Sequence, residues 1–341
     1  MGSYVIISDM MLQIGDQFDQ YQIQEHIASG GMSEIYRAYD LVNHRNVVIK
    51  IPDQSMLGDP TQFERFQREL EVMNTLNHPA ILKGLGSGKY NRIPYLVTEL
   101  VTGQSLRQLI ETSAPLPPEQ AVEIIRKVAD GLAYCHANGV IHRDLKPANI
   151  FLTTENQPVI MDFGLALTKG SHRVTYSNLT ATMGTPDYMA PEQIEGKRGD
   201  QRTDVYALGT ILFELLSGRT PFSGDNNLAI MAMHLNGTAP RLDRLQAGVA
   251  APIAAIVACC LQRVPEKRYP DMNALIAALD HPETADLALL DAAGERSERT
   301  ANPVGGTPPF WRSTAFRAVI ISVAILAIMI FLAVALQTLR R

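Results

Sequence analysis

The fold of this chain is decided by the stretch His142-Arg143-Asp144-Leu145-Lys146-Pro147-Ala148-Asn149, which is followed by Asp162-Phe163-Gly164. The acidic residue Asp144 precedes the amide residue Asn149 by five positions, and a second acidic residue, Asp162, follows that amide by thirteen. Metal-dependent phosphoryl transfer needs a carboxylate that accepts a hydroxyl proton and oxygen ligands that hold Mg²⁺ on nucleotide phosphates. The spacing predicts such a site, with Asp144 in the first role and Asn149 and Asp162 in the second.

Each of these two motifs, 142–149 and 162–164, could also be purely structural. Asp-Phe-Gly alone is a common tripeptide, and a polar turn between two short strands would contain most of the same letters. Their occurrence together, in order and at this spacing, favours catalysis, because a motif gains its meaning from its context. The stretch resembles the catalytic loop and the metal-binding loop of the protein kinase family. The resemblance implies an α+β, two-lobed fold with a β-rich N-lobe at 21–100 and a helical C-lobe at 101–280.

Length, charge and cysteine content narrow the class of protein. The 341 residues, 46% of them hydrophobic, suffice for one large domain or two smaller ones. The net charge of −5, from 30 basic and 35 acidic residues, argues against nucleic acid as the main partner. Three cysteines (Cys135, Cys259 and Cys260) are too few and too badly spaced for a disulfide framework or a zinc site, and they favour a reducing compartment.

A hairpin is predicted where alternating apolar residues flank a run of small residues near the start of the 21–280 domain. Backbone amides in such a run lie close enough to bind phosphates, although an ordinary hairpin has the same pattern. Compared with the kinase glycine-rich loop, two of the three glycines are replaced, by Ala28 and Ser33, and a Cβ restricts positive φ. The resemblance implies ATP contacts from Ile27, Ala28, Ser29, Gly30, Gly31, Met32, Ser33 and Ile35.

An ion pair is predicted between Lys50 and Glu69. Lys50 ends the buried strand pattern Val47-Val48-Ile49-Lys50, and Glu69 lies on the apolar stripe of a helix that begins at Asp59-Pro60. A carboxylate on an apolar face needs a cationic partner, whereas an exposed Glu69 would form only local pairs. The resemblance implies that Lys50 binds the α and β phosphates of ATP as a catalytic residue.

The two lobes are predicted to join at Val101-Thr102-Gly103, after strands near 81–86 and 93–99. The resemblance places Thr98 at the back of the adenine pocket, and the backbone of Glu99 and Val101 on the adenine edge. From Ser105 onward the apolar spacing becomes helical, and a long helix opens at Pro117-Pro118.

A polar, hydroxyl-rich stretch separates the metal-binding loop from Ala190-Pro191-Glu192. Such a stretch is usually a solvated loop, but in kinases this is the position of the activation segment. Thr180 and Thr182 are the candidate phosphorylation sites, and Arg143 is the candidate partner of the phosphate.

Further motifs indicate the substrate type and the framework of the domain. Lys146 and Thr185 resemble serine/threonine kinases, in which the lysine neutralises the transferring phosphate and the threonine braces the loop. By the same resemblance, Asp204 holds the backbone of the catalytic loop, and Arg268 pairs with Glu192.

The C-terminal part changes character. Residues 281–317 form a predicted flexible tether that contains charged, proline and glycine residues. Residues 318–336 contain a single polar residue, Ser322, are flanked by arginines and are long enough for a ~30 Å bilayer core. They predict one transmembrane helix followed by a short tail at 337–341, and a buried core helix is the alternative. At the other end, residues 1–20 are a predicted lead-in without a signal peptide.

These observations predict a membrane-anchored serine/threonine protein kinase that resembles bacterial eukaryote-like receptor kinases. It uses ATP with Mg²⁺ (Mn²⁺ as an alternative ion) and acts on protein substrates. Because ATP and Mg²⁺ are cytoplasmic, we expect the kinase domain to be cytoplasmic as well, on a single-pass C-terminal anchor. Pairing into a homodimer is left open by the alanines of the predicted helix. The alternative functions are a pseudokinase scaffold, which the altered glycine loop favours, and a small-molecule phosphotransferase, which the Ala190-Pro191-Glu192 motif weakens.

Overall fold

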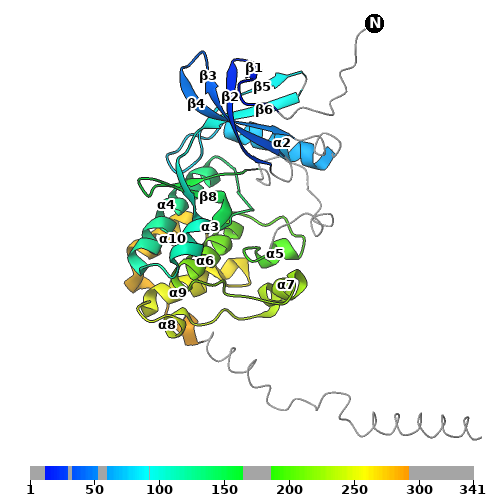
Figure 1. Cartoon of the computed structure of the whole chain (residues 1–341). Coiled ribbons are helices and arrows are strands. Elements are labelled where there is room, and N and C mark those ends of the chain that lie inside the picture. The colour runs from blue at the N-terminus through cyan, green and yellow to red at the C-terminus, as the bar shows by residue number, and fades with distance from the viewer. Residues whose placement is uncertain (1–11, 30–32, 53–59, 92, 164–185, 292–341) are drawn as a thin grey trace, which may run out of the picture. The chain divides into compact units, whose positions relative to one another are not determined.

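The computed structural model describes residues 12–29, 33–52, 60–91, 93–163 and 186–291. All of them lie in the first of two compact units, which covers 1–294, and the second unit covers 295–341. The described part has a β-rich N-lobe and a helical C-lobe, so the predicted bilobal fold is confirmed (Figure 1). The predicted membrane helix at 318–336 lies outside the described residues. Within the described ranges, every helix is too short or too polar to cross a membrane.

The N-lobe is built on an antiparallel sheet with the strand order β1-β2-β3-β4-β6-β5. Its strands are β1 (Gln17–Phe18), β2 (Tyr21–Ser29), β3 (Ser33–Asp40), β4 (Arg45–Pro52), β5 (Gly84–Tyr90) and β6 (Ile93–Glu99). The register sets Ala28 opposite Ile35, Ile35 opposite Lys50, and Lys50 opposite Leu96. Lys50 therefore lies two strands away from the predicted nucleotide loop, on one line across the sheet.

The sheet begins earlier than the strand pattern of the sequence indicates. β1 lies within the stretch expected to be a lead-in, and Phe18 is fully buried against the rings of Tyr90 and Tyr95, at centroid distances of 4.5 and 5.0 Å. A two-residue strand is too short to show any periodicity, so only its contacts reveal it.

One helix of the N-lobe, α2 (Pro60–Met73), carries Glu69. The segment after it connects the two lobes. The amide of Ile160 donates to the carbonyl of Ala80 at 2.8 Å, and the amide of Leu82 donates to the carbonyl of Ile160 at 3.0 Å. This pairing occupies part of the stretch expected to be a strand from 81, which is why β5 begins only at Gly84.

The C-lobe contains a small sheet and a set of helices. Its strands are β7 (Gly103–Ser105), β8 (Ile150–Thr153) and β9 (Pro158–Ile160). Its helices are α3 (Leu106–Ser113), α4 (Pro118–Ala137), η1 (Pro147–Asn149), α5 (Pro191–Ile194), α6 (Arg202–Ser217), α7 (Asn227–Asn236), α8 (Leu242–Leu245), α9 (Ala251–Cys260), η3 (Pro265–Lys267), α10 (Met272–Asp280) and η4 (Pro282–Thr284).

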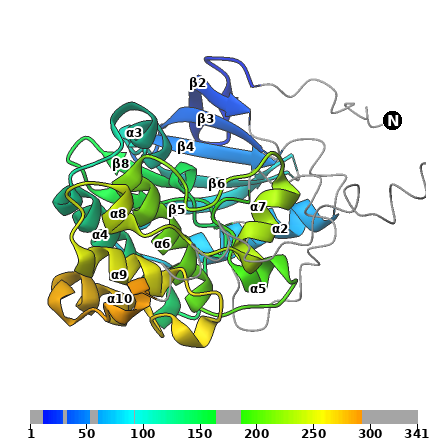
Figure 2. The same ribbon diagram turned by 90° about the horizontal axis from the view of Figure 1, so that it is seen from below.

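The central helix of the C-lobe is α6. It is buried along almost its whole length, because it is apolar on most faces and packs against both α4 and α9. The helix α10 packs against α4 and also contacts α9, which lies beside it in Figure 2. This buried helix carries Asp204 in its first turn, so its N-terminus is a rigid base for the loops above it.

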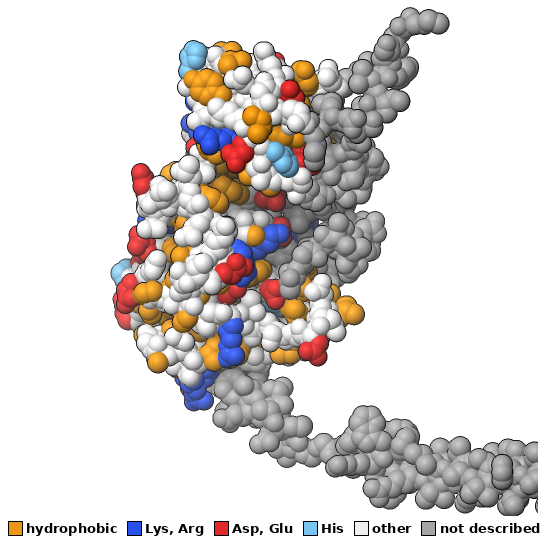
Figure 3. Space-filling model, viewed as in Figure 1, with side chains coloured by type: hydrophobic (Ala, Val, Ile, Leu, Met, Phe, Trp, Pro, Cys, Tyr) orange, Lys and Arg blue, Asp and Glu red, His pale blue; other side chains and the backbone are white. Residues whose placement is uncertain are grey.

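The surface of the described part is mixed in character. On the face shown in Figure 3, acidic and basic side chains are interspersed with apolar and uncharged ones. Large apolar side chains are exposed at several separate places, which include Ile14, Val42 and Leu228.

Candidate active site

Lys50 and Glu69 form an ion pair between strand β4 and helix α2. The Nζ atom of Lys50 lies 2.8 Å from Oε1 and 2.7 Å from Oε2 of Glu69, whose side chain is 8% exposed. Burial disfavours the charge on Lys50, but the carboxylates of Glu69 and Asp162 outweigh it and raise the pKa of the ammonium group. Burial and the charge of Asp162 raise the pKa of Glu69, against the opposing effect of Lys50. Lys50 is therefore held in its charged form, close to a carboxylate of the other lobe.

Asp144, Lys146 and Asn149 meet within the loop between α4 and β8. Lys146 Nζ donates to Oδ2 of Asp144 at 2.9 Å, and Asn149 Nδ2 donates to the same oxygen at 3.2 Å and to the carbonyl of Asp144 at 2.8 Å. Asn149 is fixed by η1, which begins at Pro147. Both side chains thus orient one carboxylate oxygen of Asp144.

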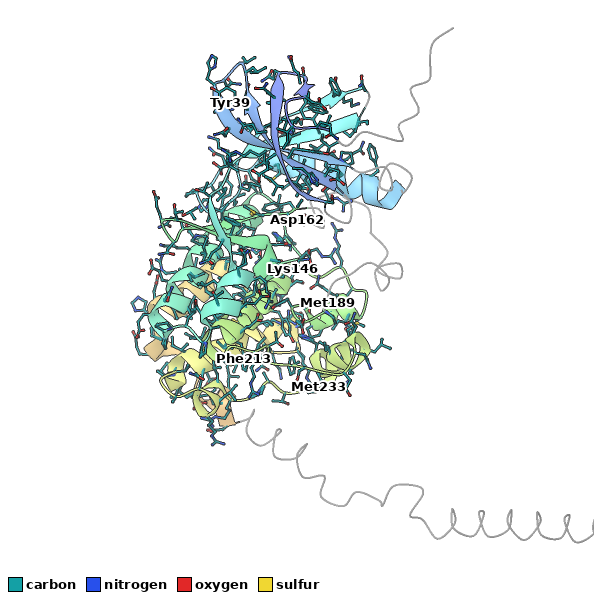
Figure 4. The ribbon with its side chains drawn as sticks, in the orientation of Figure 1. Tyr39, Lys146, Asp162, Met189, Phe213 and Met233 are labelled. Carbon is teal, nitrogen blue, oxygen red and sulfur yellow. The ribbon has the colours of Figure 1, made fainter. Side chains whose placement is uncertain are left out.

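Asp162 is the second residue after β9 and is tied to the same loop through its neighbour Met161. The amide of Met161 donates to the carbonyl of Asn149 at 2.8 Å, and the ring nitrogen Nε2 of His142 lies 3.1 Å from the carbonyl of Met161. Asp162 has a left-handed φ of 60°, a conformation that proteins keep mainly where surrounding contacts impose it. Figure 4 labels Asp162 and Lys146 near the boundary of the two lobes.

Asp204 supports the loop from below. Its Oδ2 accepts from the amide of His142 at 2.9 Å, and its Oδ1 accepts from the amide of Arg143 at 2.8 Å. Burial alone would raise the pKa of this fully buried carboxyl, but His136, His142 and the amide of Arg143 lower it. Arg143 has a left-handed φ of 66°, so the two backbone amides that donate to this one carboxylate hold a strained part of the backbone in place.

The residues expected around adenine lie at the end of β6. Thr98 is buried, pairs with Val48 of β4 and donates to the carbonyl of Glu99 at 3.3 Å. The amide of Glu99 is bonded to the carbonyl of Lys83, and Val101 is half-buried in the connection to β7.

The residues expected at the phosphate loop lie at the ends of β2 and β3. Ala28 faces Ile35 across the hairpin, Ile27 is exposed and Ser33 is buried. The hydroxyl of Ser29 donates to Glu34, which also pairs with His26. Gly30, Gly31 and Met32 lie outside the described residues, as do Thr180, Thr182 and Thr185.

A second buried ion pair lies below the site. Two guanidinium nitrogens of Arg268 donate to the two carboxylate oxygens of Glu192, both at 2.8 Å, and its side chain is fully buried. Burial opposes the negative charge of Glu192, but Arg268 outweighs it and lowers the pKa of the carboxyl. This pair joins α5 to the segment before α10.

Three supporting residues could not be found from the sequence. His136 lies 2.7 Å from Oδ2 of Asp204, Gln193 donates to the carbonyl of Arg143 at 2.8 Å, and Thr203 donates to Glu192 at 2.9 Å. Each is far in sequence from at least one residue that it supports. Only Gln193 carried a signal, since it follows the Ala190-Pro191-Glu192 motif directly.

The arrangement agrees with comparisons to known proteins. Residues 21–281 match the family model described as "Protein kinase domain". The chain belongs to the protein kinase family. Among related kinases, the serine/threonine-protein kinase PknB of Mycolicibacterium smegmatis is 35% identical over 292 residues, which are 84% of this chain and 47% of that protein.

Two further kinases are similar to this one. The serine/threonine-protein kinase PknL of Mycobacterium tuberculosis is 37% identical over 261 residues, which are 76% of this chain and 65% of that protein. The crystal structure of the PknI kinase domain of the same species, a cysteine-to-alanine mutant, has a TM-score of 0.63 and 25% identity, and the match covers 80% of this chain and 100% of that one. This kinase chain therefore spans about half of the PknB relative and less than two thirds of PknL.

Proposed function

We propose that this protein is a serine/threonine protein kinase that transfers the γ-phosphoryl group of ATP to hydroxyl groups of proteins. The observation that carries the proposal is the ion pair of Lys50 with Glu69, together with the charge of Asp162 acting on both. A partly buried ammonium group that is held in its charged form is suited to binding a polyanion.

The roles of the residues follow from their contacts. Among the described residues, the side-chain hydrogen bonds to the Asp144 carboxylate go to Oδ2, so Oδ1 can accept the hydroxyl proton of the substrate. The hydroxyl oxygen forms a bond to the γ-phosphorus, the bond to the bridging oxygen breaks, and ADP leaves. Lys146 neutralises charge near the γ-phosphate, and Lys50 binds the α and β phosphates.

A magnesium ion fits the donor set of the site. Mg²⁺ prefers oxygen ligands and commonly takes one or two carboxylates, completing its shell with water and phosphate. Asn149 uses its amide nitrogen on Asp144, which leaves the amide oxygen to act as a ligand beside the carboxylate of Asp162. When bound, Mg²⁺ neutralises phosphate charge; Mn²⁺ has the same ligand preference.

The test of the proposal is phosphoryl transfer by the full chain. With γ-labelled ATP, Mg²⁺ and a generic protein substrate, the wild type should label serine or threonine. Asp144→Asn should lower the rate about 100-fold or more, because general-base catalysis contributes at least that factor. Asp225→Asn, a change at an exposed aspartate, is the matched control and should keep the wild-type rate. Equal rates for wild type and Asp144→Asn would refute the assigned role.

A pseudokinase scaffold is the second candidate, and one feature favours it. Ala28 and Ser33 replace loop glycines, and Ser33 is buried at the start of β3. Nucleotide binding without transfer would identify a scaffold. Transfer to small molecules but not to proteins would identify the third candidate, a small-molecule phosphotransferase.

Regulation by phosphorylation of the activation segment is part of the proposal. Thr180 and Thr182 are the candidate acceptors, and Arg143 is the candidate partner of the phosphate. Mass spectrometry of active protein should find at least one of the two threonines phosphorylated. Active protein with both unmodified would exclude this form of regulation.

A membrane location completes the proposal. The apolar stretch 318–336 supports a single-pass anchor, and the need for ATP supports a cytoplasmic kinase domain. Protease added to intact cells should leave the kinase domain uncut. Homodimer formation through the same stretch is tested by cross-linking in membranes, with and without residues 318–341.

A further inference from the structure

Gln193 links the segment before α5 to the backbone of the catalytic loop. Its side chain is 3% exposed, and both ends of its amide are engaged. Nε2 donates to the carbonyl of Arg143 at 2.8 Å, and Oε1 accepts from the amide of Ala190 at 3.0 Å. A carbonyl requires a donor and an amide N–H requires an acceptor, so these two partners fix the orientation of the side-chain amide.

The carbonyl that Gln193 binds belongs to the peptide bond that precedes Asp144. Arg143 has a left-handed φ, and Asp204 binds its amide at 2.8 Å on the other side. The amide of Asp144, in the same peptide plane as that carbonyl, lies 3.3 Å from Nδ1 of His142. Because a peptide plane is rigid, a hydrogen bond at its carbonyl also sets the direction in which Asp144 leaves the backbone.

We propose that Gln193 is a positioning residue for phosphoryl transfer, which acts by fixing the Arg143–Asp144 peptide and therefore the carboxylate of Asp144. The inference rests on the proposed kinase function. Asp204 fixes the peptide before Arg143, and Gln193 fixes the peptide after it. Arg143 has a left-handed φ and is held by these two contacts, so its backbone keeps one conformation. The proposed general base, Asp144, is the next residue.

A purely structural role for the same side chain makes a different prediction. Gln193 also accepts from Ala190 and so supports the entry to α5. If this were its only role, substitutions would lower the amount of folded protein without changing the rate per folded molecule. If it positions Asp144, the rate per folded molecule falls and the affinity for ATP stays the same.

The first experiment separates the two hydrogen bonds in the full chain. Gln193→Met removes both of them, whereas Gln193→Glu keeps an acceptor for Ala190 and loses the donor to Arg143. With active sites counted by titration with a non-hydrolysable ATP analogue, both variants should show kcat lowered about 10- to 100-fold, because small displacements of a catalytic group have costs of that order. The KM for ATP should stay within about two-fold in both.

A matched control is available at Gln201. Its side-chain nitrogen also donates to a backbone carbonyl, that of Pro270, at 2.8 Å, and joins positions 69 residues apart. Gln201→Met should therefore keep the wild-type kcat while losing a contact of the same type and length, although this one is exposed to solvent. A fall in kcat in this control as large as that in Gln193→Met would overturn the inference.

The decisive measurement is a double-mutant cycle with Asp144→Asn. If Gln193 acts through the Asp144 carboxylate, Gln193→Met should slow the wild type about 10-fold or more, but should change the residual rate of Asp144→Asn by less than about two-fold. Equal slowing in both backgrounds would overturn the inference, as would an unchanged kcat in both Gln193 variants. If the wild type itself transfers no phosphate, the proposed function fails and the inference fails with it.

Discussion

The Nζ atom of Lys50 donates to both carboxylate oxygens of Glu69, at 2.8 and 2.7 Å, across the gap between β4 and α2. A bidentate contact fixes the direction of a flexible lysine and keeps its charge in a partly buried place. The same contact fixes α2 against the sheet. The position of α2 therefore helps to decide where the ammonium group lies.

Substitution of Glu69 should weaken nucleotide use. In Glu69→Gln, Lys50 loses its bidentate partner, and hydrogen bonds to charged groups are worth about 1.5–3 kcal/mol. We expect kcat/KM for ATP to fall about 10- to 100-fold. Glu71→Gln, at an exposed position of the same helix, is the control and should keep the wild-type value. Steady-state kinetics with varied ATP decide the matter, and equal values for the two variants would contradict the prediction.

Two of the arginine-carboxylate pairs in the C-lobe, one buried and one exposed, should contribute differently to the stability of the protein. Arg268→Met leaves Glu192 buried without its cation and should cost about 3–5 kcal/mol in the free energy of unfolding. Arg126→Met breaks a solvent-exposed pair with Asp280 and should change the free energy of unfolding little, because water screens the charges of this pair. Urea unfolding of both variants measures the difference. Losses of similar size would show that burial does not set the strength of these pairs.

Stability should fall on acidification because of His234. This fully buried ring lies 2.7 Å from the hydroxyl of Tyr206, and burial lowers its pKa from 6.5 to about 4. Below pH 6.5 the unfolded chain binds a proton at this residue that the folded protein does not bind until about pH 4. The stabilising contribution of neutral His234 is therefore fully present above pH 6.5 and is lost as the pH falls to about 4. The loss between pH 7 and pH 5 is about 2 kcal/mol.

The variant His234→Gln isolates this contribution. It should reduce the difference in unfolding free energy between pH 7 and pH 5 by the same ~2 kcal/mol, because glutamine does not titrate. The exposed His44 is the control, and His44→Asn suits its positive φ of 52°. The control should keep the wild-type pH dependence. An unchanged slope in His234→Gln would rule out this histidine as the source.

Gly103 should be intolerant of a side chain. It has a φ of +147°, and a Cβ would overlap the carbonyl oxygen of Leu152 on the neighbouring strand β8. Gly103→Ala should therefore destabilise the protein by about 3 kcal/mol. A Cβ on Gly86 in β5 would meet no atom within 4 Å, so Gly86→Ala should change stability by less than about 1 kcal/mol. Thermal unfolding of both variants tests this difference.

Most of the fold could be predicted from local patterns. The apolar run that ends at Lys50 and the long helical pattern that opens at Pro118 correspond to β4 and α4. The two short elements β1 and β7 could not be predicted, because strands of two or three residues have no period to detect. Element boundaries near Ile81 also shifted, since a backbone contact with Ile160 replaced the expected start of a strand.

A contact of the candidate site could be predicted from the sequence where a buried charge requires a partner of opposite charge. A carboxylate on the inward face of α2 requires a cation, and the preceding strand offers Lys50. Chemistry demanded no partner at His136 or Gln193, because a histidine or glutamine in a helix is equally compatible with solvent. Their partners, Asp204 and Arg143, lie 68 and 50 residues away.

The order of residues alone determined which chemical groups this protein has and at what spacing: a base, an amide and a second carboxylate on adjacent loops, with a lysine on an earlier strand. Only the tertiary structure decided how the backbone between them is held. The left-handed conformation of Arg143 is unfavourable by itself and persists because Asp204 and Gln193, from distant helices, bind the two sides of that residue. Local sequence cannot encode such support, because the free energy that stabilises it comes from contacts formed only when the lobe is packed.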